Sequence, residues 1–130
     1  MRTDSIVNER KVVIADDEPG LLQLLKAVVG SEHYEVLTAL NGNDALDLIR
    51  EHRPDFALLD VWMPGRTGIQ VVEAVRKDSS LDDVQLVLLS AQGDAAHVEA
   101  GLAAGAAYYL KKPFSAFKLR QLVQDGILAA

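Results

Sequence analysis

Cysteine is absent from the sequence, which excludes disulfides, cysteine-ligated zinc, iron–sulfur clusters and thiol catalysis. No apolar run is long enough to cross a membrane, and residues 1–10 lack the apolar region of a signal peptide. Positive charge is also scarce, because 13 Lys and Arg residues face 19 Asp and Glu residues and leave a net charge of −6. We therefore expect a cytoplasmic protein that binds neither nucleic acid nor membranes.

The rest of the composition is that of one globular domain. The chain has 130 residues, of which 49% are hydrophobic and 25% are charged, and these values suit a single core rather than a disordered chain. No repeat, linker or low-complexity segment interrupts the sequence. We expect residues 11–130 to form one domain that follows a polar N-terminal lead over residues 1–10.

Short apolar runs and amphipathic stretches alternate along the chain. The runs are typical of buried strands and cover residues 11–15, 34–39, 56–59, 84–89 and 107–111. Helical spacing of apolar residues begins near Pro19, Asn41 or Asn43, Thr67, Ala95 and Ser115, and residues 77–83 are expected to form a polar loop. Five strands alternating with five helices predict an α/β fold with a doubly wound parallel sheet and helices on both faces.

The residues with reactive side chains fall at the ends of the predicted strands. Asp16 and Asp17 follow the first strand, Asp60 the third, Ser90 the fourth and Lys112 the fifth. The carboxyl ends of parallel strands share one edge of the sheet, which is where doubly wound folds bind ligands. Each residue taken singly is more often a solvated loop residue or a helix cap. Their joint position predicts one crevice with three carboxylates, a hydroxyl and an ammonium group.

A cluster of carboxylates needs a cation. Two carboxylates ~5 Å apart repel by roughly 3 kcal/mol at an effective dielectric constant of about 20. Oxygen ligands favour Mg²⁺ or Ca²⁺, and a few carboxylates with room for water and phosphate favour Mg²⁺. Mg²⁺ beside a carboxylate, a hydroxyl and a lysine suits phosphoryl transfer, in which Asp60 would form an acyl phosphate contacted by Ser90 and Lys112.

In their order and spacing, these elements resemble the receiver domain of two-component response regulators over residues 11–128. The matching elements are Asp16-Asp17-Glu18, Asp60 with Met63-Pro64 and Gly68, Ser90-Ala91, and Lys112-Pro113-Phe114. The resemblance implies a flavodoxin-like, five-stranded sheet with the order 2-1-3-4-5, which the strand pattern alone does not give.

The resemblance also implies a role for each residue of the site. Asp60 matches the phosphoryl acceptor, and Lys112 matches the invariant lysine of the family. Asp17, Asp60 and the backbone carbonyl of Trp62 match the groups that bind Mg²⁺ directly. Asp16 matches the acid that acts mainly through bound water.

A switch is implied as well. Ser90 matches the hydroxyl that turns toward the phosphoryl group, and Tyr109 matches the aromatic residue that swings into the space behind it. Phosphorylation adds about −1.5 to −2 units of charge and three acceptor oxygens. The expected result is a population shift at the face made by the fourth strand, the Ala-rich helix over residues 95–104 and the fifth strand.

The implied partners are proteins. A histidine kinase or phosphotransfer protein would donate the phosphoryl group from a phosphohistidine, and a downstream effector domain or protein would bind the switched face. A homodimer through the fourth helix, fifth strand and fifth helix is a further expectation. The protein is not expected to be a turnover enzyme, since its chemistry would be limited to its own phosphorylation and autodephosphorylation.

Two other functions compete with this one. A receiver-like adaptor that works without phosphorylation is disfavoured by the complete set of acids, Ser90 and Lys112. A Mg²⁺-dependent hydrolase with an aspartyl-phosphate intermediate is disfavoured because Trp62 stands where a second general acid would be expected.

Several positions depart from the family pattern or suggest other chemistry. The ring of Trp62 could shield an acyl phosphate from water, or it could be a surface aromatic without consequence, and the two interpretations have equal weight. Ala107-Tyr108 stands where the winged-helix transcription-factor branch carries two acids, so the charged dimer face of that branch is not expected. Tyr108 is instead an apolar partner contact or an exposed aromatic. The solvated surface is the expected location of His33, His52 and His97.

Overall fold

The computed structural model describes residues 10–30, 34–91 and 95–125 of the chain. The predicted polar lead, apart from Arg10, and the predicted surface residue His33 lie outside these ranges. Within them, no helix combines the length and the apolar character needed to cross a membrane.

Five parallel strands form one sheet in the order β2-β1-β3-β4-β5. The strands are β1 (Lys11–Ala15), β2 (Glu35–Ala39), β3 (Phe56–Asp60), β4 (Gln85–Ser90) and β5 (Tyr108–Lys111). The predicted fold class and strand order are therefore confirmed. The starts of β2, β4 and β5 lie one residue later than predicted. The chain order reverses between β1 and β3, so the ends of these two strands flank the switch point of the sheet.

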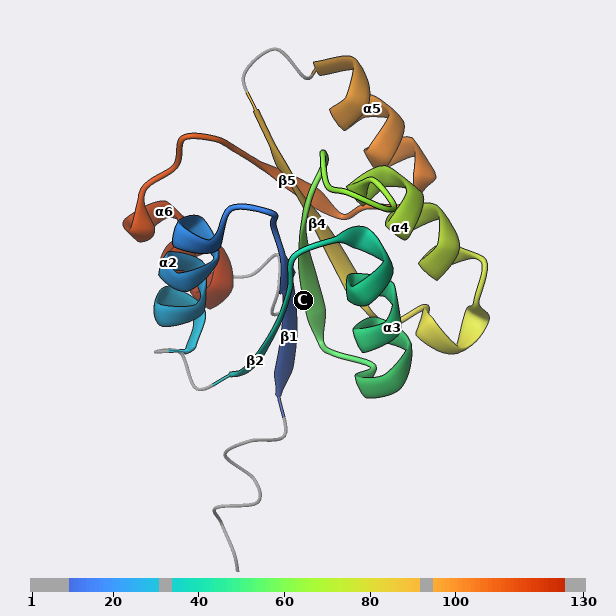
Figure 1. Ribbon diagram of the computed structural model, residues 1–130, viewed down its shortest axis with the longest axis horizontal. Coiled ribbons are helices and arrows are strands. Elements are labelled where there is room, and N and C mark those ends of the chain that lie inside the picture. The colour runs from blue at the N-terminus through green and yellow to red at the C-terminus, as the bar shows by residue number, and fades with distance from the viewer. Residues whose placement is uncertain (1–9, 31–33, 92–94, 126–130) are drawn as a thin grey trace, which may run out of the picture.

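Helices cover both faces of the sheet (Figure 1). The helices α2 (Pro19–Gly30) and α6 (Ala116–Asp125) pack against each other on one face. The helices α3 (Gly42–His52), α4 (Gly68–Arg76) and α5 (Ala95–Ala104) lie side by side on the other. This arrangement leaves the carboxyl edge of the sheet open between the loops that lead into the helices.

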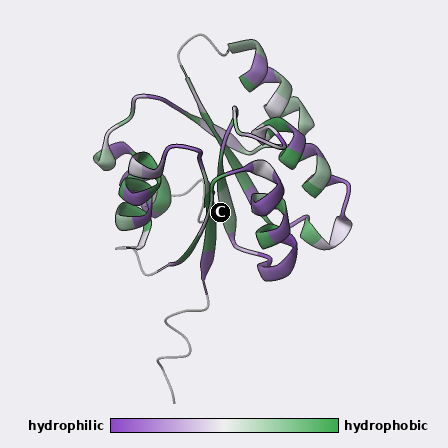
Figure 2. Cartoon of the chain, viewed as in Figure 1, coloured by the Kyte–Doolittle hydropathy of each residue, from purple (hydrophilic) through white to green (hydrophobic). Residues whose placement is uncertain are grey.

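The core follows from the alternation of side chains along the strands. In β1, Val12 and Ile14 join the cluster beneath α2 and α6, whereas Val13 and Ala15 join the cluster beneath α3 and α4. All five residues of β3 are buried, as expected for a strand that is covered on both faces. Hydrophobic residues accordingly gather in the central strands, while the helices carry both kinds (Figure 2).

Local signals in the sequence set the starts of the helices. Pro19 opens α2, as predicted. Asn41, rather than Asn43, caps α3 by accepting a hydrogen bond of 2.8 Å from the backbone N–H of Asp44. Ser115 accepts a bond of 3.1 Å from the N–H of Lys118 at the start of α6, which confirms its predicted role.

The prediction of a polar loop over residues 77–83 was wrong at Leu81. A short 3₁₀ helix, η1 (Ser79–Leu81), is capped by Asp78 and turns Leu81 into the core, where it is 1% exposed. The guanidinium of Arg76 donates to the backbone carbonyls of Leu81 and of Gly105, at 3.2 and 3.1 Å, and so ties η1 to the turn before β5.

Candidate functional site

Three carboxylates meet at the carboxyl edge of the sheet, as the positions of the strand ends predicted. Asp16 and Asp17 follow β1, and Asp60 is the last residue of β3. One carboxylate oxygen from each lies within 4.8 Å of the others. Asp16 is fully buried and Asp60 is 7% exposed, whereas Asp17 faces solvent. The site is thus a shallow acidic pocket with two inner acids and one outer acid.

Asp16 is held by its own loop. Its backbone N–H donates to the carbonyl of Ala39 at the end of β2, and its Oδ1 accepts a bond of 2.9 Å from the N–H of Glu18. The second oxygen of its carboxylate, Oδ2, faces Lys112. These bonds fix the orientation of the carboxylate and supply partners for a fully buried charge, which would otherwise be strongly unfavourable.

Lys112 reaches into the acidic pocket from the end of β5. Its Nζ lies 2.9 Å from Asp16 Oδ2, 3.4 Å from Asp60 Oδ2 and 3.6 Å from Glu18 Oε1. Burial opposes the charge of this side chain, but the hydrogen bond to Asp16 and the charge of Asp60 outweigh that effect and raise the pKa of Lys112. The contact with Glu18 was not foreseen, because nothing in the local sequence indicates where a side chain of this helix entrance points.

Asp60 has the most perturbed acid–base equilibrium in the pocket. Burial, followed by the neighbouring negative charge of Asp16, raises the pKa of Asp60 to about 6. Lys112 and the backbone N–H of Trp62 act in the opposite direction by stabilising the ionised carboxylate. Burial and a neighbouring acid thus disfavour the ionised form of Asp60, although Lys112 lies close to it.

The loop that follows β3 requires glycine at two points. The Cβ of any other residue at position 68 would lie 2.3 Å from the carbonyl oxygen of Asp60, so α4 begins in direct contact with the acceptor strand. Gly65 has a φ of +77°, a conformation that favours glycine. The N–H of Gly68 donates to the carbonyl of Val61 at 2.8 Å and closes the loop. This backbone fixes the direction in which Trp62 leaves the sheet.

Trp62 is not an isolated surface aromatic. Its indole is 50% exposed and packs edge to face against the imidazole of His97 in α5, with ring centroids 4.8 Å apart and planes at 72°. His97 is exposed, as predicted, but its contact with Trp62 was not foreseen. The other described histidine, His52, lies 3.7 Å from Glu51 at the end of α3, far from this site in the fold.

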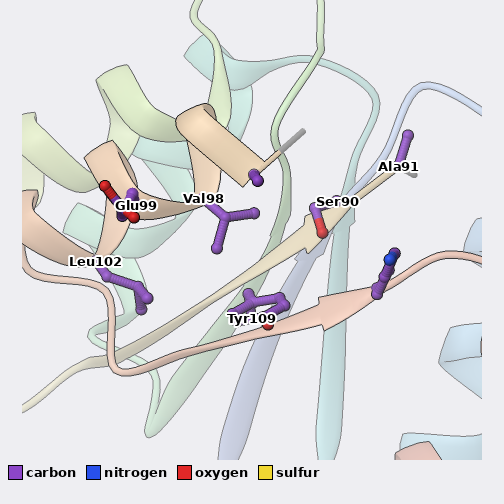
Figure 3. A pocket seen from close by; sticks show the side chains of 8 residues that line it. Ser90, Ala91, Val98, Glu99, Leu102 and Tyr109 are labelled. Carbon is purple, nitrogen blue, oxygen red and sulfur yellow. The ribbon is translucent and has the colours of Figure 1, made fainter. Parts of the chain in front are cut away.

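A cavity adjoins the acidic pocket between α5 and the end of the sheet. It has a volume of about 320 Å³ and extends from Ser90 to Leu102. Figure 3 shows Val98 and Leu102 of α5 facing Tyr109 of β5, with Ser90 at the end of β4. Ser90 is 2% exposed, whereas Tyr109 is 39% exposed, so the ring lies at the mouth of the cavity and the hydroxyl lies at its inner end.

Tyr108 is not the exposed aromatic that one of its two interpretations predicted, and the predicted partner contact stays a prediction. It is half-buried, stacks on Tyr109 with centroids 5.8 Å apart, and packs against the core beneath α2 and α6. This packing against the core explains why an aromatic residue is accommodated at position 108.

The donor set of the pocket fits a hard divalent cation. Asp16, Asp17 and Asp60 offer only oxygen atoms, and no cysteine or histidine belongs to the cluster formed by the described residues. Burial and then the charge of Asp16 raise the pKa of Asp60 even with Lys112 in place. A Mg²⁺ ion would stabilise the ionised form of Asp60, and the exposure of Asp17 leaves a path for the ion from solvent.

Comparisons with known sequences and with solved structures indicate the same family. The sequence model of the response regulator receiver domain matches residues 12–124. A response regulator from Chloroflexus aurantiacus is 35% identical, with a TM-score of 0.85 over 93% of this chain and 98% of that chain. The chemotaxis response regulator CheY4 of Vibrio cholerae is 32% identical, with a TM-score of 0.82 over 88% of this chain and 96% of that one.

A third structure, the receiver domain of the Francisella response regulator 1452, is 31% identical, with a TM-score of 0.80 over 92% of this chain and 95% of that chain. The family match covers nearly all of the described residues. It agrees with the observed order of the strands and with the resemblance that the residues at the strand ends indicated. The chain therefore belongs to the response regulator receiver domain family.

Proposed function

We propose that this phosphoryl-accepting signalling domain takes its phosphoryl group onto Asp60, with the help of Mg²⁺. One observation carries the proposal: Asp60 ends the central strand in a pocket with Asp16, Asp17 and Lys112, and its pKa is raised to about 6. The ionised form of Asp60 is disfavoured here, and a bound cation would stabilise it. Asp60 is 7% exposed and lies at the open edge of the sheet, which is the side from which a donor would approach.

The proposed roles of the surrounding residues follow from their positions. Asp17, Asp60 and the carbonyl of Trp62 would hold the Mg²⁺ ion, with Asp16 acting through bound water. The ion, when bound, neutralises charge on the phosphoryl oxygens and orients the group for in-line attack. Lys112 already lies 3.4 Å from Asp60, so its ammonium group needs little movement to pair with a phosphoryl oxygen instead.

The chemistry is an exchange of one bond for another. A carboxylate oxygen of Asp60 attacks the phosphorus atom of a phosphohistidine on a histidine kinase or phosphotransfer protein. The P–N bond breaks, its electron pair returns to the imidazole, and an acyl phosphate forms on Asp60. No side chain of the pocket needs to donate a proton to the carboxylate, since Asp60 must be ionised to act.

Ser90 and Tyr109 are proposed to convert this event into a change of surface. A hydrogen bond from the Ser90 hydroxyl to the phosphoryl group would draw that side chain outward. Tyr109 would then move from the mouth of the cavity of about 320 Å³ toward its inner end. The apolar lining from Val98 and Leu102 favours burial of the ring, which is now 39% exposed.

The proposed output surface is formed by α5, β5 and α6. Leu102, Tyr109 and Phe117 are exposed on these elements by 38%, 39% and 67%, so apolar area is available for a downstream effector or a second copy of the chain. Inward movement of Tyr109 would change this area and hence the affinity of the surface for its partner.

A fluorescence experiment tests the proposed function. Trp62 is the only tryptophan and lies beside the pocket, so its emission should change on addition of Mg²⁺ and again on addition of beryllofluoride. Asp60→Asn should abolish the second change. Absence of any response, together with an unchanged mass after a small phosphodonor, would support the adaptor alternative. Turnover of many equivalents of a phosphate ester would support the hydrolase alternative.

A further inference from the structure

The contact between Trp62 and His97 joins two parts of the site that the strand ends do not connect. Trp62 belongs to the loop that follows the acceptor, and His97 belongs to the second half-turn of α5. Their rings meet edge to face, with centroids 4.8 Å apart and an interplanar angle of 72°. This is a favourable geometry for two aromatic rings. The contact restrains the indole, which remains half-exposed.

The backbone of Trp62 acts on Asp60 directly. Its N–H donates to the Asp60 carboxylate and favours the ionised form. Its neighbour Val61 is locked to the sheet by an N–H bond of 2.9 Å to the carbonyl of Leu89, and it accepts the N–H of Gly68 at 2.8 Å. Val61 is also fully buried, so residue 62 is the first position of this loop whose side chain is exposed.

Helix α5 is attached to the sheet by few side chains. Val98 and Gly101 are its buried residues. A Cβ at Gly101 would lie 2.1 Å from the Leu88 side chain, so the helix backbone packs closely against that side chain of β4. His97 lies one turn before Gly101, on the same side of the helix, and extends this contact face past the end of the sheet to the indole of Trp62.

We infer that His97 is a positioning residue that acts on the phosphoryl-acceptor site through Trp62. The inference rests on the proposed function of Asp60. While α5 is docked through Gly101, the imidazole of His97 restrains the indole of Trp62. The indole in turn restrains residue 62, whose N–H bonds to Asp60 and whose carbonyl is proposed to bind Mg²⁺. A movement of α5 would thus alter the surroundings of Asp60 through His97 and Trp62. This connection is separate from the one through Ser90 and Tyr109.

The inference predicts a specific effect of His97→Ala. Loss of the ring contact frees the indole, so acrylamide should quench Trp62 fluorescence more efficiently in Mg²⁺-free protein. The acceptor loop should be less well ordered. The affinity for Mg²⁺, measured by calorimetry, and the rate of Asp60 phosphorylation by phosphoramidate should therefore each fall by about two- to tenfold, the range expected for one aromatic pair.

Two further variants separate positioning from a general loss of structure. His97→Phe keeps a ring at this position and should restore the quenching, the Mg²⁺ affinity and the rate toward the unmodified values. His52→Ala removes an imidazole from the end of α3 and should change none of the three. Circular dichroism of each variant checks that the fold is retained.

The outcomes distinguish this inference from the proposed function. If His97→Ala leaves quenching, Mg²⁺ affinity and phosphorylation rate unchanged while Asp60→Asn prevents phosphorylation, the positioning role is overturned and the acceptor role stands. If His97→Phe behaves like His97→Ala, a role that depends on the ring is also overturned. If the unmodified protein is never phosphorylated, the proposed function fails, and the quenching and calorimetry still decide whether His97 orders the loop.

Discussion

Lys112 Nζ lies 2.9 Å from Asp16 Oδ2, although 96 positions separate the two residues in the sequence. The pair joins β5 to β1 across the carboxyl edge of the sheet and places the ammonium group between two inner acids. Lys112 therefore stabilises the folded protein even without a phosphoryl group. Its removal should lower the free energy of unfolding as well as the rate of phosphorylation.

Lys112→Met should lower the free energy of unfolding in Mg²⁺-free buffer by about 2–3 kcal/mol, because it leaves Asp16 buried without its cation. Added Mg²⁺ should recover part of this loss. Urea unfolding with EDTA and with Mg²⁺ measures both effects. Lys111→Met is the matched control, since Lys111 is exposed and should contribute little. Equal stabilities for the two variants would contradict the assigned ion pair.

Asp60→Asn should stabilise the metal-free protein at neutral pH. The pKa of Asp60 is about 6 in the folded protein against 3.8 ordinarily, so the folded state binds its proton more tightly. The contribution of Asp60 to stability is therefore most favourable below about pH 4, declines up to about pH 6 and stays low above that. Asp60→Asn should gain about 1–2 kcal/mol at pH 7 after allowance for solvent screening, and nothing near pH 4.

Unfolding in EDTA across this pH range measures the difference between Asp60→Asn and the unmodified protein. Asp47→Asn, on the exposed side of α3, is a control that should show no such dependence. If the difference in unfolding free energy between Asp60→Asn and the unmodified protein is constant from pH 4 to pH 8, the pocket does not disfavour the ionised form of Asp60.

Gly101→Ala should disturb the packing of α5 against β4. Its Cβ would lie 2.1 Å from Cδ1 of the buried Leu88 side chain, so that side chain or the helix must shift, at a cost of about 1–3 kcal/mol in stability. Gly20→Ala is the control, because nothing lies within 4 Å of its Cβ and alanine favours a helix. Thermal unfolding and amide hydrogen exchange of α5 check the prediction. Similar melting temperatures for the two variants would mean that α5 is not held at Gly101.

Ser90→Ala should separate phosphorylation from the switch. Loss of a hydrogen bond to a charged phosphoryl oxygen should slow phosphorylation of Asp60 by about tenfold or more. It should also keep Tyr109 at the mouth of the cavity after Mg²⁺ and beryllofluoride are added. Fluorotyrosine resonances report the position of the ring, with Tyr34, buried on the opposite face, as an internal reference. An unchanged Tyr109 signal in the unmodified protein would exclude the proposed movement.

The sheet and the strand-end acids were predictable because they depend on local patterns. The apolar run over residues 56–59 is continuous and is followed by the turn signal of Pro64 and Gly65, and parallel strands bring their ends together whatever their order. The caps at Asn41 and Ser115 involve partners three residues away. The strand order itself required the family resemblance.

The remaining features depend on contacts between distant segments. Leu81 lies in a polar stretch, and only the turn made by η1 and the bonds from Arg76 direct it inward. The contact of Glu18 with Lys112 and that of His97 with Trp62 depend on how separate helices are placed on the sheet. Neither has a signal in the local sequence. The pKa of Asp60 likewise follows from burial, which only the assembled fold provides.

Intact-mass spectrometry decides whether Asp60 is the phosphoryl acceptor. The protein is incubated with phosphoramidate and Mg²⁺, then compared with Asp60→Asn and with a sample that contains EDTA, and borohydride reduction marks the acyl phosphate for peptide mapping. We expect one phosphoryl group per chain on Asp60, and none in the variant or without the metal. A phosphoryl group on another residue, or equal modification of Asp60→Asn, would contradict it.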